Sequence, residues 1–138
     1  MPMSFTASAT TLAGRNGHVK SETGVVDLDL AMPKPDGSPG KPGATNPEEL
    51  FASGYSACFG SAVIAVAGAE KLRPEQVSIT ADVTLLTENN DFRLAVVLKA
   101  HIEGLEASEA ERIVHKAHEV CPYSKATRNN IKVELEIV

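Results

Sequence analysis

The feature that most constrains the fold is the segment from Leu50 to Ala67, in which nearly every residue is hydrophobic or small. The residues before it favour a helix start. Asn46 is a good N-cap, Pro47 suits the first helical position, and Glu49 can complete a capping box. A helix that is apolar around its whole circumference is buried on all sides. In a chain of 138 residues, we therefore expect a central helix wrapped by sheet or by a partner subunit.

Alternating apolar and polar residues predict β-strands on both sides of this helix. The clearest alternation runs over residues 76–87 and 92–102, which the turn Asn89-Asn90-Asp91 joins into a hairpin. Shorter strands are expected at residues 4–12, 25–30 and 131–138, with a turn at 14–17 and a Pro/Gly-rich loop at 33–43.

A second helix is expected from Ala107 to Val120, with Ser108 capping its start and Pro122 ending it. Its apolar stripe consists of Ala110, Ile113, Val114, Ala117 and Cys121. Tyr123 to Arg128 then forms a short turn. The order strands, helix, hairpin, helix, strand predicts an α+β fold with helices packed on antiparallel sheet, in a single domain over residues 1–138.

The charge balance argues against two classes of partner. The formal net charge is −5 and the pI is near 5.3, with no cluster of Lys and Arg. A protein that binds nucleic acid or an anionic membrane needs a basic face. The longest strongly apolar stretch, residues 61–67, is too short to span a bilayer, and the start shows no secretion signal. We therefore predict a cytoplasmic protein that binds neither nucleic acid nor membrane.

Cys58 and Cys121 are the only cysteines, and in a reducing compartment a structural disulfide is not expected. Either thiol can be an inert part of the core, which is the common role of a free cysteine. Two thiols also suffice for a disulfide cycle, and Cys121 precedes Pro122 at a helix break, where a new helix start would favour its thiolate. A third alternative is zinc bound by His115, His118, Cys121 and Cys58, although positions three residues apart drift by about 60° per step around a helix.

Two long motifs surround these cysteines. Cys58 lies in GATNPEELFASGYSACF and Cys121 lies in VCPYSKATR. Together with the segment AGRNG around Arg15, these strings closely resemble the organic hydroperoxide resistance (Ohr) branch of the Ohr/OsmC family, and the likeness covers essentially the whole chain. The resemblance implies an OsmC-like fold, with antiparallel sheets wrapped around a buried central helix, in an intertwined homodimer.

The same resemblance implies a thiol peroxidase that reduces alkyl and fatty-acid hydroperoxides to alcohols. Carried over by position, Cys58 would be the peroxidatic thiol and Cys121 the resolving thiol, while Arg15 and Glu48 would orient and activate Cys58. Members draw electrons from dihydrolipoyl groups on lipoylated proteins, so no tightly bound cofactor and no metal is expected. A non-catalytic redox sensor or a zinc-binding module that uses the same cysteines remains as the alternative.

Overall fold

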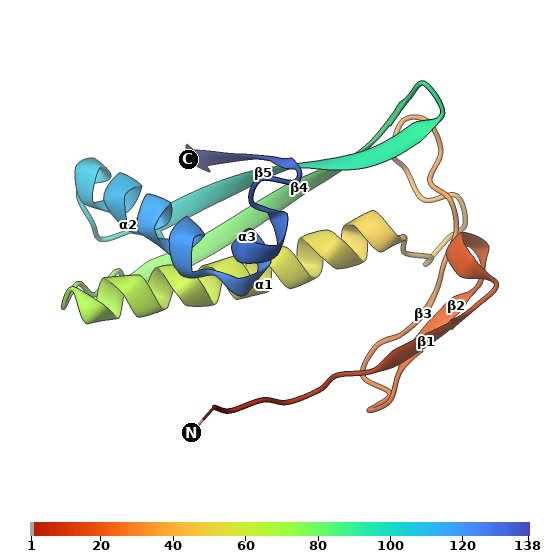
Figure 1. Ribbon diagram of the computed structural model, residues 1–138, viewed down its shortest axis with the longest axis horizontal. Coiled ribbons are helices and arrows are strands. Elements are labelled where there is room, and N and C mark those ends of the chain that lie inside the picture. Colours follow the sequence, from red (N-terminus) through yellow and green to blue (C-terminus); the bar gives the residue numbers. More distant parts are fainter. Residues whose placement is uncertain (1) are drawn as a thin grey trace. The chain divides into compact units, whose positions relative to one another are not determined.

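The computed structural model describes residues 2–138 and divides them into two compact units, one ending at Leu50 and one running from Phe51 to Val138. We call them the N-terminal unit and the C-terminal unit. Each contains one three-stranded sheet. The first of the three α-helices begins just before the boundary, and the other two lie within the C-terminal unit. The mixture of helices and sheets confirms the α+β class (Figure 1).

The N-terminal unit is a small antiparallel sheet in the order β1-β2-β3. Its strands are β1 (Ala9–Leu12), β2 (His18–Ser21) and β3 (Asp27–Asp29), and a 3-10 turn, η1 (Gly14–Asn16), joins the first two. β2 was not predicted, because four residues of mostly polar sequence show no apolar alternation. The unit buries little apolar surface: its buried hydrophobic residues are Val19 and Leu30.

The long helix α1 (Pro47–Ala69) begins where the sequence predicts. The Asn46 side-chain oxygen accepts a hydrogen bond from the Glu49 backbone N–H at 2.8 Å, which confirms Asn46 as the N-cap. In the part of the chain that the structure describes, α1 is the one helix that is long and apolar enough to cross a membrane by length and composition alone, and 33 % of its apolar window is buried inside the protein. Only part of its surface is covered by the rest of the chain, and Ile64 remains 58 % exposed.

The sheet of the C-terminal unit starts with the predicted hairpin, formed by β4 (Gln76–Glu88) and β5 (Asp91–Glu103). Asn89 and Asn90 join the strands with positive φ angles of 52° and 63°, as a tight hairpin turn requires. The last strand, β6 (Lys132–Ile137), pairs with β5 in parallel, so the sheet is mixed and the expectation of an antiparallel sheet is wrong for this strand. The reason is the helical crossover between β5 and β6, which returns the chain in the same direction.

That crossover consists of α2 (Ala107–Val120) and α3 (Pro122–Thr127). The limits of α2 agree with the prediction, but its N-cap is Glu106 and Ser108 lies inside the helix. The expected cap is wrong because helical bonding already starts at Glu106, whose carbonyl accepts the Ala110 N–H at 2.9 Å. The segment after Cys121, expected as a turn, is the helix α3, with Pro122 in its first turn.

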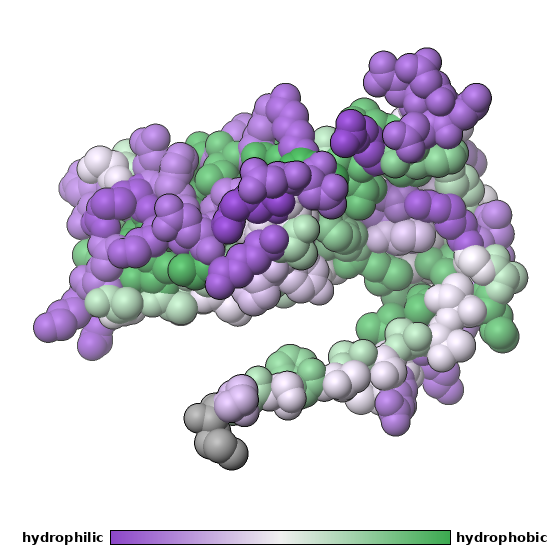
Figure 2. Space-filling model, viewed as in Figure 1, coloured by the Kyte–Doolittle hydropathy of each residue, from purple (hydrophilic) through white to green (hydrophobic). Residues whose placement is uncertain are grey.

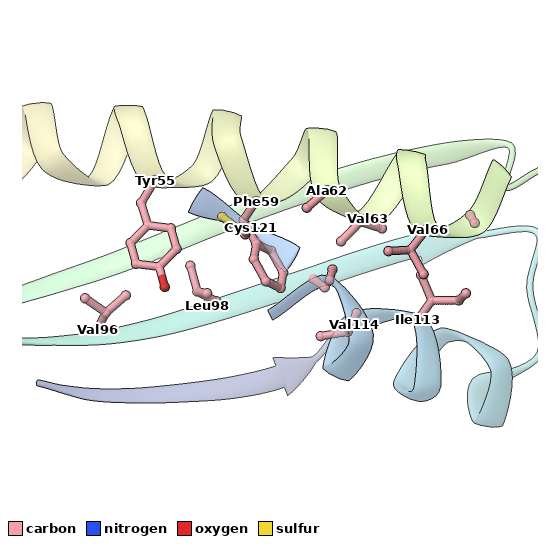
Figure 3. Close-up of a cluster of buried hydrophobic side chains, with 13 residues drawn as sticks. Tyr55, Phe59, Ala62, Val63, Val66, Val96, Leu98, Ile113, Val114 and Cys121 are labelled. Carbon is pink, nitrogen blue, oxygen red and sulfur yellow. The ribbon is translucent and has the colours of Figure 1, made fainter. Parts of the chain in front are cut away.

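The core of the C-terminal unit lies between one face of its sheet, α1 and α2 (Figure 3). On the sheet, Val96, Leu98 and Ala100 of β5 point into it, flanked by the alternating apolar positions of β4 and β6. Figure 3 shows Tyr55 and Phe59 pointing from α1 toward Val96 and Leu98. The buried members from the helices are Tyr55, Phe59, Ala62, Val63, Val66, Ala67, Ile113, Val114, Ala117 and Cys121. This packing fixes α1 and the end of α2, which carry the two cysteines.

Candidate active site

The two cysteines meet in the C-terminal unit. Their sulfur atoms are 3.6 Å apart, and both are free thiols. Their exposure differs: Cys121 is fully buried, whereas Cys58 is only partly buried. A reactant from solvent therefore has access to Cys58, and Cys121 is accessible mainly to Cys58.

Cys121 is held by backbone bonds on both sides because it ends α2 and begins α3. Its N–H donates to the Ala117 carbonyl at 2.8 Å, and its own carbonyl accepts the Lys125 N–H at 3.0 Å. Pro122 makes this junction abrupt, since proline cannot continue α2 but suits the first turn of α3. The direction of the Cys121 side chain is therefore set by how the two helices are docked.

The surroundings of Cys58 in this unit favour its protonated form. Burial raises the pKa of the Cys58 thiol, and the neighbouring Cys121 raises it further. A backbone N–H of Tyr123 donates to the Cys58 sulfur and acts in the opposite direction, but the pKa remains raised. A reactive thiolate at this position therefore needs a positive charge from elsewhere.

An aromatic cluster lies along the helix face next to Cys58. The rings of Phe51, Tyr55 and Tyr123 have centroids 5.7 to 6.3 Å apart. Gly54 makes room for Tyr123, because a Cβ at this position would lie 2.9 Å from the tyrosine hydroxyl. Tyr55 is fully buried, so the cluster forms part of the packing between α1 and α3.

The N-terminal unit holds the predicted charged pair. Arg15 and Glu48 form a two-pronged ion pair, with Nη1–Oε1 at 2.7 Å and Nη2–Oε2 at 3.1 Å. The Arg15 side chain is 40 % exposed and the Glu48 side chain 15 %. Glu48 thus orients a guanidinium that keeps donors free for another group.

The turn that carries Arg15 is a specific structure and not a generic surface turn. Ala13 and Gly14 have φ angles of 61° and 56°. Gly17 is required by close approach, because a Cβ there would lie 1.6 Å from the Leu12 carbonyl oxygen. Asn16 fastens the turn by accepting the Met32 N–H at 3.0 Å. These contacts give Arg15 a defined position despite its exposure.

The structure therefore brings the four predicted residues together in two pairs, Arg15 with Glu48 and Cys58 with Cys121, one in each unit. It also contains a polar network that the sequence analysis missed, formed by Tyr55, His118, Ser124 and Thr127. The signal for it was Tyr55 itself, since a tyrosine buried in an apolar helix needs a hydrogen-bond partner for its hydroxyl.

The zinc alternative has little geometric support. Within residues 2–138, no three His, Cys, Asp or Glu side chains form a group that could hold a metal ion. The Nδ1 atom of His118 is instead 2.7 Å from the Ser124 hydroxyl.

Comparison with known proteins identifies the family of this chain. The OsmC-like protein family matches residues 39–136, a range that contains Glu48, Cys58 and Cys121. The organic hydroperoxide resistance protein OhrA of Bacillus subtilis is 48 % identical over 135 residues, which cover 96 % of this chain and 95 % of that protein. This chain belongs to the Ohr branch of the OsmC-like family.

Solved Ohr structures share the fold over nearly the whole chain. An organic hydroperoxide resistance protein from Legionella pneumophila has a TM-score of 0.89 and 51 % identity, covering 99 % of this chain and 98 % of that one. A Vibrio cholerae protein described as a putative organic hydroperoxide resistance protein, crystallised with captopril bound in one of its active sites, has a TM-score of 0.88 and 43 % identity, covering 99 % of this chain and 94 % of that one. The OsmC-like fold predicted from the motifs is thus confirmed.

Proposed function

We propose that this Ohr-family protein is a thiol peroxidase that reduces organic hydroperoxides, including alkyl and fatty-acid hydroperoxides, to alcohols. The observation that carries the proposal is the thiol pair, in which a partly exposed Cys58 lies 3.6 Å from a fully buried Cys121. This asymmetry suits a cycle in which one thiol meets the substrate and the other reacts only with the first. The names of the relatives support the substrate class.

The reaction proceeds in three balanced steps. The Cys58 thiolate attacks the terminal peroxide oxygen, the O–O bond breaks, and the alcohol leaves after taking up a proton, so that Cys58 becomes a sulfenic acid. The Cys121 sulfur then attacks the Cys58 sulfur, which forms a disulfide and releases water. Dihydrolipoyl groups of a lipoylated protein return two electrons by thiol–disulfide exchange, and their own dithiol becomes a disulfide.

The first step depends on the thiolate. At an ordinary pKa of about 8.5, only ~3 % of a thiol is ionised at pH 7, and burial raises the pKa of Cys58 further. We propose that Arg15, oriented by Glu48, supplies the missing positive charge to Cys58 and hydrogen bonds to the peroxide oxygens. An arginine suits both tasks because it stays charged and presents several donors in a planar fork.

We further propose that the protein works as a homodimer in the cytoplasm. Apolar side chains of the N-terminal unit face outward, among them Phe5 at 95 %, Val25 at 88 % and Leu12 at 73 % exposure. Figure 2 shows apolar residues, in green, on the surface of the N-terminal unit. Exposed apolar area of this kind marks a binding surface, and a second copy of the chain is the occupant that the dimer proposal requires.

The decisive experiment is steady-state turnover of purified protein with an organic hydroperoxide and dihydrolipoamide. We expect many turnovers for each protein chain and a preference for organic hydroperoxide over hydrogen peroxide. A protein that is oxidised once and then stops would be a sensor instead of an enzyme. Zinc in the purified protein, released on oxidation, would overturn the peroxidase mechanism.

A further inference from the structure

A buried hydrogen-bond network links the helices that carry the two cysteines. The Tyr55 hydroxyl of α1 lies 2.8 Å from the Ser124 hydroxyl and 3.1 Å from the Thr127 hydroxyl, both in α3. His118 of α2 joins the network through Nδ1, which is 2.7 Å from the Ser124 hydroxyl. The network therefore ties α1, α2 and α3 together.

The network lies beside the thiol pair in both segments. Tyr55 precedes Cys58 by three residues, close to one helical turn, and Ser124 follows Cys121 by three residues. The same two stretches of chain are thus in contact twice: through the free thiols of Cys58 and Cys121, and through the hydrogen bond between Tyr55 and Ser124. Figure 3 shows Tyr55 and Cys121 beneath α1, with the tyrosine hydroxyl pointing away from the helix axis.

A cluster of hydroxyl groups is unusual inside a hydrophobic core. Tyr55 and Ser124 are fully buried, and Thr127 is 5 % exposed. Buried hydroxyls need partners, and apolar side chains of the same shape would fill the space without that requirement. What a satisfied buried network adds is a defined geometry, because each hydrogen bond has a preferred distance and direction.

Defined geometry matters most for Cys121. The segment that follows it, α3, has six residues, too few to be a stable helix by itself. Its docking depends on the contacts of Ser124 and Thr127, and on Arg128, whose guanidinium donates to the His118 carbonyl at 2.5 Å. The Cys121 side chain must approach Cys58 from 3.6 Å to the length of a disulfide bond, about 2.05 Å.

We propose that Tyr55 is a positioning residue for the second step of the cycle, holding α3 through Ser124 and Thr127 so that Cys121 attacks oxidised Cys58. This inference rests on the proposed peroxidase function. It assigns the network to disulfide formation and not to the attack on peroxide, because Tyr55 bonds the helix of Cys121 and makes no hydrogen bond to Cys58 among the described contacts.

The two fates of the Cys58 sulfenic acid provide the measurement. It condenses with Cys121, or a second peroxide oxidises it to sulfinic acid. The ratio of sulfinic acid to disulfide therefore reports the rate of condensation at a given peroxide concentration. Both products arise from the same intermediate. Circular dichroism must show that each variant is folded, because an unfolded chain would also raise the ratio.

The test compares Tyr55→Phe with Ser56→Ala, which removes a hydroxyl from the same helix outside the network, where it donates to the Ser53 carbonyl. A misplacement of about 1 Å can cost roughly a hundredfold in rate. For Tyr55→Phe we expect an unchanged rate for the first equivalent of peroxide and an increase of about tenfold or more in the sulfinic-to-disulfide ratio. Ser56→Ala should keep the wild-type ratio.

A second pair of variants covers the case in which Tyr55→Phe does not fold. Thr127→Val removes the hydroxyl and keeps the shape, so it should raise the sulfinic-to-disulfide ratio. Thr127→Ser keeps the hydroxyl and should show the wild-type ratio. Wild-type ratios in both Tyr55→Phe and Thr127→Val would overturn the inference, as would a peroxide step that slows in proportion. If the wild-type protein itself forms no Cys58–Cys121 disulfide, the proposed function fails, and this inference fails with it.

Discussion

The two units of this protein are built in different ways. The C-terminal unit has a continuous core between sheet and helices, and within it the two thiols lie in contact. Among its described residues, the N-terminal unit has two buried hydrophobic side chains, Val19 and Leu30, and other apolar side chains of this unit face outward. Its charged pair joins the turn η1 to the start of α1. One unit is thus stabilised by its own packing, and the proposed dimer would supply the surface that covers the other.

This difference separates two requirements of the proposed chemistry. Two thiols that form a disulfide need fixed distances, which a packed core provides. A cation that serves an incoming substrate must keep free donors, and Arg15 has them because it is partly exposed. The predictions below separate the contributions of the two units, starting with the largest expected effect.

Cys58→Ser should reduce peroxidase activity to background while the fold is kept. Serine has nearly the same size as cysteine but is a far weaker nucleophile. The measurement is turnover with an organic hydroperoxide and dihydrolipoamide, with circular dichroism as the control for folding. Substantial turnover in a pure sample of this variant would remove Cys58 from the mechanism.

Cys121→Ser should consume about one equivalent of peroxide for each chain and then stop. Without the resolving thiol, Cys58 should stall as sulfenic acid and become over-oxidised. Mass spectrometry after peroxide treatment should show added oxygen on Cys58. Sustained turnover with the dithiol would mean that the reductant reacts with the sulfenic acid directly.

Arg15→Ala tests whether the N-terminal unit acts on the thiol. A charge-assisted hydrogen bond contributes about 1.5–3 kcal/mol, so the peroxide step should slow roughly ten- to hundredfold. The pKa of Cys58, measured from the pH dependence of its alkylation, should rise, and Arg15→Lys should restore the rate only in part. If Arg15→Ala changes neither quantity, the activation of Cys58 needs another explanation.

Substitutions of two leucines, one in each unit, test how the packing of the units differs. Leu98 is fully buried, and Leu12 is 73 % exposed. Leu98→Ala should lower the free energy of unfolding by about 2–5 kcal/mol through the cavity that it leaves. Leu12→Ala should mainly weaken the proposed dimer, and sedimentation equilibrium should show a higher dissociation constant. A stable wild-type monomer at micromolar concentration would contradict the dimer and the proposed role of this surface.

The smallest expected effect is that His18 and His118 contribute to stability with opposite pH dependence. Asp29 and Asp27 raise the pKa of His18, whereas burial, with Arg128 and His115, lowers the pKa of His118. The contribution of His18 to stability is therefore complete below the ordinary pKa of about 6.5 and is lost as the pH rises through its folded value. For His118 the sign is reversed: stability is complete above about 6.5 and falls as the pH drops toward its folded value. NMR titration of both rings checks the two directions, and equal pKa values would contradict them.

Much of the fold could be predicted because its signals are local. The apolar run of α1, the cap at Asn46, the Asn89-Asn90 turn and the stripe of α2 each follow from residues within one element. The parallel pairing of β6 could not be predicted in this way, since direction depends on how the crossover helices pack.

The site shows the same limit. The motifs identified Cys58 and Cys121 by their resemblance to a family, and no local pattern indicated that their sulfurs would be in contact. The pairing of Arg15 with Glu48 spans 33 residues, and the bond between Tyr55 and Ser124 spans 69. Interactions over such separations arise from tertiary packing, so a single sequence carries no periodic signal for them.

The most direct test of the central claim is the intact mass of wild-type protein after treatment with one equivalent of an organic hydroperoxide. The proposed cycle predicts a loss of two hydrogen atoms in each chain, a disulfide peptide that joins Cys58 to Cys121, and full recovery of both thiols with dihydrolipoamide. Free thiols after the peroxide has been consumed, or disulfides only between chains, would contradict it.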